Sequence, residues 1–255
     1  MAVSLKRVLS LSNVVATFLT IIINSLSNTS ILGANTVGEI SDAYPTFFTP
    51  AGYVFAIWGI IYALLLIFAI FQALPKQQNA IFIEKISVYY LLCSVANIIW
   101  IVLWVNNYIL FSTGLMFLLL VSLIIIYRRL DSIGTQMSLR ENLVVFLPFS
   151  VYLGWITVAS IGNVAVTLVS LSWNGWGISE VTWTILMIGV AIAITLMMIF
   201  RKRDIGFSLV SIWALLGILT KQSGVQNIVL TTGSGIGLIV IALVIQAIRS
   251  LRLER

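Results

Sequence analysis

The sequence predicts an all-α integral membrane protein, a polytopic helical bundle of about eight transmembrane helices. Of its 255 residues, 60% are hydrophobic and only 9% are charged, and the mean hydropathy is +1.12. A soluble globule of this composition would lack the polar surface that water requires. Apolar runs of about twenty residues recur, the length that crosses roughly 30 Å of hydrocarbon. Such spans must be helices, because lipid offers no hydrogen-bond partner to a free backbone group.

Eight apolar segments, separated by short polar stretches, account for these spans. The fifth segment is the longest and the seventh is the shortest, so the count depends most on these two. The predicted spans cover about residues 12–33, 50–74, 87–105, 108–127, 143–171, 180–200, 206–221 and 227–248.

The basic residues predict the orientation of the spans, because loops rich in lysine and arginine stay cytoplasmic. With eight spans, every basic cluster falls on one side and only Lys221 falls on the other, together with Glu39, Asp42 and Glu180. We therefore expect both termini to be cytoplasmic. No organelle-targeting presequence or clear cleavage site is seen, so we expect a retained first span and a bacterial-type cytoplasmic membrane. The clustered basic residues are Lys6, Arg7, Lys76, Lys85, Arg128, Arg129, Arg140, Arg201, Lys202, Arg203, Arg249, Arg252 and Arg255.

The net charge of +6 does not require a nucleic acid. Basic residues scattered over several loops are explained by topology and by anionic headgroups, so the expected partners are membrane lipids. The single cysteine, Cys93, lies within a predicted span, where a small buried apolar residue is the expected role.

Three connecting segments have recognisable features. The outer segment Asn35–Thr49 is long enough to fold over the mouth of a helical bundle. Asn106 and Asn107 predict a tight turn, so the third and fourth spans should form an antiparallel hairpin. Ser179, at the end of a seam that begins at Trp173, is predicted to cap the sixth span.

Three hydrophobic segments carry aromatic and amide residues at spacing i, i+3, i+7, which places each set on one face of a helix. If the three faces converge, they form a flat aromatic pocket with two amides, suited to binding a hydrophobic ring system rather than to conventional catalysis. At 1.5 Å per residue, Trp58 lies about 12 Å from the outer end of its span, beneath the outer segment. The sets are Phe55, Trp58 and Tyr62; Asn97, Trp100 and Trp104; and Tyr152, Trp155 and Ala159, with Asn163 one turn further on.

Other roles for these residues stay open. Tryptophan and tyrosine gather at membrane interfaces as anchors, and Asn97 and Asn163 would also serve as hydrogen-bonding partners between helices, worth about 1 kcal/mol. The small side chain of Ala159 leaves room for a ligand or for a neighbouring helix. The interfacial interpretation fits Trp104, Trp173, Trp176 and Trp183, whereas Trp58, Trp155 and Trp213 lie deeper and also fit helix packing.

The segment TPAGYVFAIWGIIYAL, from Thr49 to Leu64, resembles the proline- and tryptophan-rich second helix of the TspO/MBR family, the tryptophan-rich sensory proteins and translocator proteins. ANIIW, which contains Asn97, is similar to the family's third-helix Asn-x-x-Trp. YLGWITVASIGN, ending at Asn163, is similar to its fifth-helix pattern. The resemblance covers about residues 12–174, so we expect a five-helix domain over residues 1–174 and three additional spans with a basic cytoplasmic tail over residues 175–255.

The resemblance implies a membrane-embedded binding or sensory protein, not an enzyme, whose outer loop caps a pocket for a porphyrin or related tetrapyrrole, a sterol or a similar planar ligand. Matching residues would line or support it: Trp58, Asn97, Trp100, Trp155, Ala159 and Asn163. The chain departs from the family at Tyr53, where tryptophan is usual, at Ile57, where a second proline is usual, and in a Phe55-to-Trp58 spacing that is one residue short. Tyr53 is retained among the expected pocket residues, and the identity of the ligand stays open.

The last predicted span contains TTGSGIG, from Thr231 to Gly237, which is unusually small and polar. Gly233 and Gly237 favour close helix packing, within the chain or in a homodimer. The alternative is a broken helix whose freed backbone groups meet a substrate, as in secondary transporters. The second hypothesis for function is a facilitative transporter of a lipophilic or small organic solute, in which the three additional spans complete a pathway.

Several chemistries lack the residues that they need. The chain has no histidine, and no carboxylate lies in the middle of a predicted span, so proton relays and metal ligation are not expected. A haem iron would lack a histidine ligand, leaving a porphyrin ring held by stacking. No nucleophile and base pair or phosphate-binding loop is recognisable.

Overall fold

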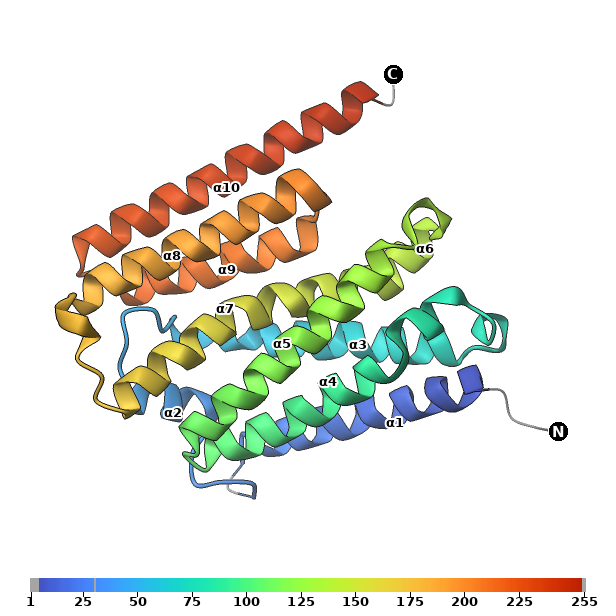
Figure 1. Ribbon diagram of the computed structural model, residues 1–255, viewed down its shortest axis with the longest axis horizontal. Coiled ribbons are helices and arrows are strands. Elements are labelled where there is room, and N and C mark those ends of the chain that lie inside the picture. The colour runs from blue at the N-terminus through green and yellow to red at the C-terminus, as the bar shows by residue number, and fades with distance from the viewer. Residues whose placement is uncertain (1–4, 30, 254–255) are drawn as a thin grey trace. The chain divides into compact units, whose positions relative to one another are not determined.

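The computed structural model describes residues 5–29 and 31–253, and all regular secondary structure in these ranges is helical (Figure 1). The prediction of an all-α polytopic membrane protein is confirmed. Within the described residues, seven helices are long and apolar enough to cross a membrane, and a further apolar helix, Ile205–Lys221, is shorter. The helices are α1 Leu5–Leu26, α2 Val37–Ala43, α3 Ile57–Ala73, α4 Ile81–Val105, α5 Ile109–Asp131, α6 Leu139–Glu141, α7 Leu147–Ser170, α8 Glu180–Met197, α9 Ile205–Lys221 and α10 Gln226–Leu253.

The first span lies closer to the N-terminus than the predicted range 12–33. Helix α1 begins at Leu5 and ends at Leu26, and the next residues tighten into turns in which Thr29 N donates to Leu26 O at 3.0 Å. The apolar run around Ile31, which is 69% exposed, therefore belongs to the connecting segment. Hydropathy alone could not locate this end, because apolar residues continue beyond the turn-forming Asn28 and Thr29.

Helix α4 begins earlier than the predicted start at residue 87, but its backbone is interrupted at that position. Ser87 has φ 48° and ψ −143°, which is not helical. The continuous part of the helix therefore begins just after Ser87, close to the predicted boundary.

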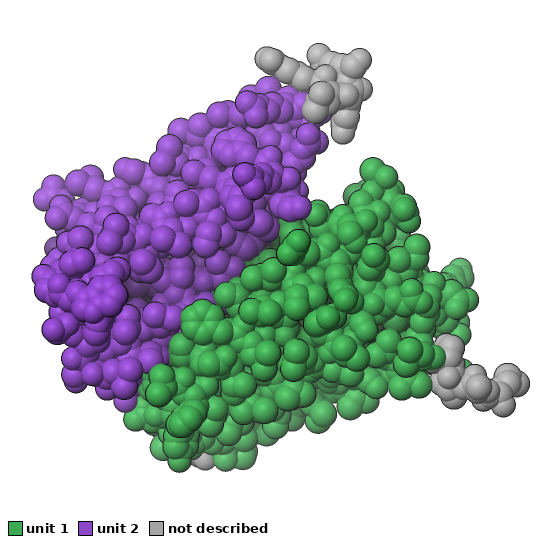
Figure 2. Space-filling view, viewed as in Figure 1, with its two compact units in different colours: residues 1–40, 56–156 green, residues 41–55, 157–255 purple. Residues whose placement is uncertain are grey.

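The described chain separates into two compact units, drawn in different colours in Figure 2. Unit 1 contains the residues up to Ile40 and Ala56–Ile156, and unit 2 contains Ser41–Phe55 and Thr157 onward. The boundary falls within α7 and within α2. The expected domain division at residue 174 stays a prediction.

Unit 1 is built around α4, which packs against α1 and α5, with α3 also against α1. The hairpin of α4 and α5 is confirmed: Asn107 takes the left-handed conformation with φ 66°, and Tyr108 N donates to Leu103 O at 2.9 Å. The centre of the unit is aromatic, since the rings of Phe68, Tyr90 and Phe149 lie 5.1 to 5.7 Å apart.

Unit 2 contains α8, α9 and α10, which lie side by side (Figure 1). The capping role of Ser179 is confirmed, because its hydroxyl accepts a hydrogen bond from Thr182 N at 3.2 Å. Asp204 caps α9 in the same way, with Phe207 N donating to Asp204 Oδ1 at 3.0 Å.

Helix α10 runs without interruption from Gln226 to Leu253, so the broken-helix interpretation of the glycine-rich segment is wrong. Close packing within unit 2 occurs at Gly235, where an added Cβ would collide with the Ile192 side chain of α8. Gly233 and Gly237 have no atom of the described chain within 4 Å of an added Cβ. These two glycines therefore do not pack within the described chain, and a homodimer through them stays a prediction.

Candidate ligand-binding site

Trp58, in the first turn of α3, is the centre of an aromatic cluster in unit 1. Its ring centroid lies 5.5 Å from Tyr62, 5.8 Å from Trp100, 5.9 Å from Tyr152 and 6.1 Å from Trp155. These partners come from α3, α4 and α7, so the structure brings the three predicted faces together at one tryptophan. Trp58 is half-buried, whereas Trp100 and Trp155 are each 3% exposed.

Four rings of the cluster form a ladder of nearly parallel planes. The planes of Tyr62 and Trp58 differ by 21°, those of Trp58 and Trp100 by 31°, and those of Trp100 and Trp104 by 28°. Tyr152 and Trp155 meet Trp58 edge-on, at 71° and 82°. Aromatic rings prefer such offset-stacked and edge-to-face arrangements, so the ladder presents π-faces suited to another flat ring.

An amide chain lies beside the rings. Asn24 Nδ2 donates to Asn97 Oδ1 at 2.6 Å, and Asn97 Nδ2 donates to Tyr152 OH at 2.8 Å. Asn97 is fully buried and Asn24 is 6% exposed. The sequence analysis missed Asn24, although a polar residue in an apolar span was the signal for it.

The Tyr62 hydroxyl differs from that of Tyr152. It is buried and has no hydrogen-bond partner among the described residues. A buried hydroxyl normally finds a partner, so Tyr62 offers a donor and an acceptor beside the ladder.

Trp104 is not an interfacial anchor. It is 3% exposed, and its indole N–H donates to Val37 O at 3.2 Å. Asn106 Nδ2 donates to Leu32 O at 2.7 Å in the same region, and an added Cβ on Gly33 would lie 2.8 Å from Val105 O. The segment that leads into α2 therefore lies directly on the end of α4, next to the ladder.

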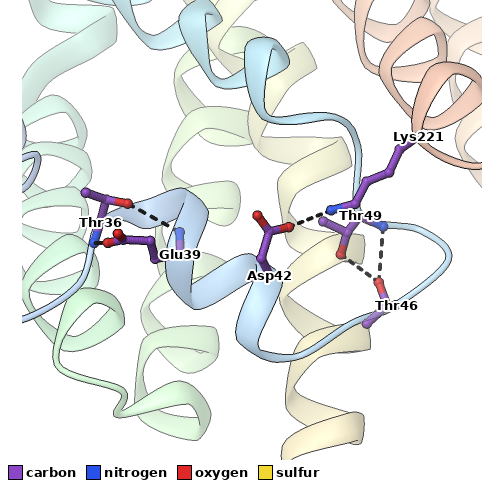
Figure 3. Close-up of polar contacts among 6 residues, drawn as sticks. All are labelled: Thr36, Glu39, Asp42, Thr46, Thr49 and Lys221. Atoms are coloured by element: carbon purple, nitrogen blue, oxygen red, sulfur yellow. Dashed lines mark hydrogen bonds and ion pairs between the residues drawn. The ribbon is translucent and has the colours of Figure 1, made fainter.

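The beginning of α2 is held by a reciprocal cap, visible in Figure 3. Thr36 N donates to Glu39 Oε2 at 2.6 Å, and Glu39 N donates to Thr36 Oγ1 at 3.3 Å. The hydrogen bond from the Thr36 backbone, followed by that from its side chain, lowers the pKa of Glu39 below its usual value.

The rest of the outer segment is held by α9 within unit 2. Ala51 N donates to Gly217 O at 3.0 Å, and Trp213 Nε1 donates to Val54 O at 3.0 Å. Lys221 Nζ pairs with Asp42 Oδ1 at 2.6 Å, and Thr46 and Thr49 are joined through their hydroxyls at 2.8 Å (Figure 3). The sequence analysis gave no role to α9, because contacts between residues so far apart in the chain leave no local signal.

The remaining predicted pocket residues lie in unit 2. Tyr53 is 46% exposed and packs edge-on to Trp213, with ring centroids 5.3 Å apart. Phe55 and Ala159 are half-buried, and Asn163 is 6% exposed. Asn163 Nδ2 donates to Ala159 O at 3.0 Å, one turn back in its own helix. Their roles in a pocket stay predictions.

The other tryptophans form a separate cluster in unit 2. The ring centroids of Trp173, Trp176 and Trp183 lie 5.4 to 6.2 Å apart, and Trp183 Nε1 donates to Gly175 O at 2.9 Å. Trp176 is 77% exposed, in line with an interfacial position.

No residue named in the aromatic cluster carries a carboxylate, ammonium or guanidinium group, and its polar atoms are amides, hydroxyls and indole N–H groups. Among the described residues, no group of three or more His, Cys, Asp or Glu side chains is placed to hold a metal ion. The cluster is thus equipped for stacking and for neutral hydrogen bonds.

Comparison with known protein families identifies the family to which the chain is similar. A family model described as TSPO-like protein matches residues 10–246. The match continues past residue 174 and includes the last three helices, which the sequence motifs had left outside the resemblance. The chain has no significant match among curated proteins or solved structures.

Proposed function

Because the chain belongs to the TSPO-like protein family, we propose that it is a membrane-embedded binding protein with a sensory role. Its ligand is a planar hydrophobic molecule, such as a porphyrin or related tetrapyrrole, or a sterol. It acts by binding, without converting the ligand.

The observation that carries this proposal is the position of Trp58. Its half-buried ring contacts four other aromatic rings from three helices, all within 6.1 Å. Each aromatic pair contributes about 0.5–1.5 kcal/mol beyond area burial, and the same attraction extends to a flat ligand. In this arrangement the ligand lies against the part of the Trp58 ring that the other rings leave uncovered.

Neutral polar groups beside the rings orient the ligand. The Tyr62 hydroxyl has no hydrogen-bond partner among the described residues, so it meets a polar group of the ligand. Asn97 holds Tyr152 in place from α4 and is itself held by Asn24. A buried site with a few placed polar groups in an aromatic wall is the usual form of a small-molecule site.

The outer segment controls access in this proposal. Its first part rests on α4 through Trp104, and its later part is held by α9 through Trp213 and Lys221. Helix α9 therefore holds the later part of the outer segment. Both termini lie on the cytoplasmic side in a bacterial-type membrane, as the distribution of basic residues favours.

The test is a titration of the purified protein in detergent with protoporphyrin, followed by tryptophan fluorescence. Wild type should show saturable quenching at about micromolar concentration, which corresponds to roughly 8 kcal/mol of binding free energy. Trp58→Leu should weaken binding at least about tenfold, because it removes the stacking surface. Trp176→Phe is the matched control: it also removes one tryptophan, but from the separate exposed cluster.

Unsaturable quenching, or equal binding by Trp58→Leu and wild type, would contradict the proposal. The continuous α10 removes the broken-helix argument for transport, whereas a pathway completed by the last three helices stays the alternative. Flux of the same ligand into sealed vesicles containing the protein, above the rate of empty vesicles, would support that alternative.

A further inference from the structure

Helix α1 turns its polar side toward the protein and its apolar side outward. The polar residues are spaced three and four apart, which places them on one face. None is more than 6% exposed, whereas Val15, Leu19 and Ile22 are 57%, 49% and 51% exposed. We call this set the α1 polar face; it consists of Ser10, Asn13, Thr17, Thr20, Asn24 and Ser27.

The α1 polar face meets polar partners on α3 and α4. Asn13 Nδ2 donates to Gln72 Oε1 at 3.1 Å, and Ser10 Oγ donates to Gln72 O at 3.0 Å. Thr17 Oγ1 and Tyr90 OH share a hydrogen bond of 2.7 Å. Hydrogen bonds between helices are an ordinary means of association in membranes, so these contacts alone describe packing.

Three buried polar atoms, two on the α1 polar face and one on the facing helix α3, are not explained by packing. Asn13 Oδ1, Gln72 Nε2 and Thr20 Oγ1 are buried and have no hydrogen-bond partner among the described residues. Asn13 and Thr20 are 0% and 4% exposed, and Gln72 is 1% exposed. A buried polar group without a partner is costly in a low-dielectric interior, and in native structures such groups usually bind ordered water or a ligand.

The unpartnered atoms define the chemistry that fits them. Asn13 and Gln72 are joined by one hydrogen bond, so the free acceptor of Asn13 and the free donor of Gln72 belong to one amide pair. A molecule that both accepts and donates satisfies the two together, and the Thr20 hydroxyl can do either. No charged residue lies between Arg7 and Glu39 in the sequence, so the α1 polar face supplies no counter-charge and the molecule is neutral.

We propose that the stretch from Ser10 to Thr20, with Gln72, is a second binding region, for small neutral molecules that both donate and accept hydrogen bonds, one at the Asn13 and Gln72 pair and one at Thr20, about two helical turns further on. Water is the smallest member of this class, and amides and polyols are the next. The site lies one or more helical turns away from the Asn24 and Asn97 pair and uses none of the aromatic ladder. It therefore does not depend on the function proposed above.

The test uses thiol reactivity, because a thiol ionises and reacts only where water reaches it. The native thiol is first removed by Cys93→Ala, so that the reagent reports on the introduced cysteine. Alanine is chosen because Cys93 is buried. In this background, Thr20→Cys reports on the α1 polar face, and Leu19→Cys, at the same depth but 49% exposed to the outside of the bundle, is the matched control. Both are exposed to a small water-soluble methanethiosulfonate in vesicles.

Thr20→Cys should react at least about tenfold faster than Leu19→Cys, because only the polar face provides the hydration that a thiolate needs. Adding Asn13→Leu and Gln72→Leu together should lower the labelling rate of Thr20→Cys to that of Leu19→Cys. Circular dichroism should show that the helical content is retained. Equal rates at the two cysteines, or no reaction at either, would overturn the proposal.

Saturating acetamide and glycerol distinguish the members of the class. Slower labelling of Thr20→Cys in either solute, with Leu19→Cys unchanged, assigns the site to an organic amide or polyol. Unchanged labelling of Thr20→Cys, with the tenfold difference retained, assigns it to water.

Discussion

Trp213 of α9 donates its indole N–H to the carbonyl oxygen of Val54 at 3.0 Å, across 159 positions of sequence. Val54 is fully buried and lies four residues before Trp58. A helix near the end of the chain therefore fixes the backbone that leads into the aromatic cluster. Since the indole N–H is the only polar atom of tryptophan, its substitution tests this relationship directly.

Trp213→Phe should loosen the segment around Val54 while α9 stays folded, because phenylalanine keeps the ring and loses the donor. We expect faster amide exchange for residues 51–56, by about fivefold if a hydrogen bond worth about 1 kcal/mol is lost. Hydrogen exchange followed by mass spectrometry measures the exchange rate of this segment. Unchanged exchange in this segment would show that the Trp213 bond does not hold it.

Gly217→Ala should destabilise the protein by about 1–3 kcal/mol, because the added Cβ collides with the Val54 side chain and lies 3.0 Å from Pro50 Cβ. Gly189→Ala is the matched control in a neighbouring helix, since no atom lies within 4 Å of its added Cβ. The control should be neutral or slightly stabilising, as alanine favours helix more than glycine does. Thermal unfolding in detergent compares the two, and equal midpoints would refute the close contact.

Asn97→Leu should cost about 1–3 kcal/mol of unfolding free energy, because it removes the acceptor of the buried Asn24 amide and the donor to the Tyr152 hydroxyl. Asn24→Leu combined with Asn97→Leu should cost less than the sum of the single changes. A double-mutant cycle on unfolding free energy measures this coupling. Strict additivity would mean that the two amides do not act together.

Asp42→Asn should change the unfolding free energy by no more than about 1 kcal/mol, because the ion pair with Lys221 is at the surface and the Asp42 side chain is 69% exposed. Any effect should shrink as salt is added, since screening weakens exposed pairs. Thermal unfolding at low and high ionic strength tests both expectations. A large effect that persists in high salt would show that the pair is essential to the fold of the outer segment.

Acid should weaken the cap of α2. The folded pKa of Glu39 is lowered, so its stabilising effect is present above the unfolded pKa and is lost as the pH falls through the folded pKa. Amide exchange at Thr36, corrected for the intrinsic effect of pH, should accelerate over that acidic interval. Glu39→Gln should remove this pH dependence, and its persistence in that variant would assign it to another group.

Local chemistry allowed much of the fold to be predicted from sequence. Apolar runs in lipid must become helices, so the helical segments followed from composition and length. The Asn106–Asn107 turn and the Ser179 cap also followed, because turns and caps depend on a few neighbouring residues. Helical spacing alone placed Trp58, Trp100 and Trp155 each on the same face of its helix as the other members of its set.

What only the tertiary structure decided is which of these faces meet and which polar residues turn inward. Spacing fixes the direction of a side chain relative to its own helix axis, whereas the rotation of that axis depends on its neighbours. The structure therefore showed that Trp58 is the centre of the ladder, that Asn24 supports Asn97, and that Trp213 holds Val54. It also showed that α1 buries Asn13 and exposes Leu19, since in a membrane lipid takes the apolar side and the protein interior takes the polar one.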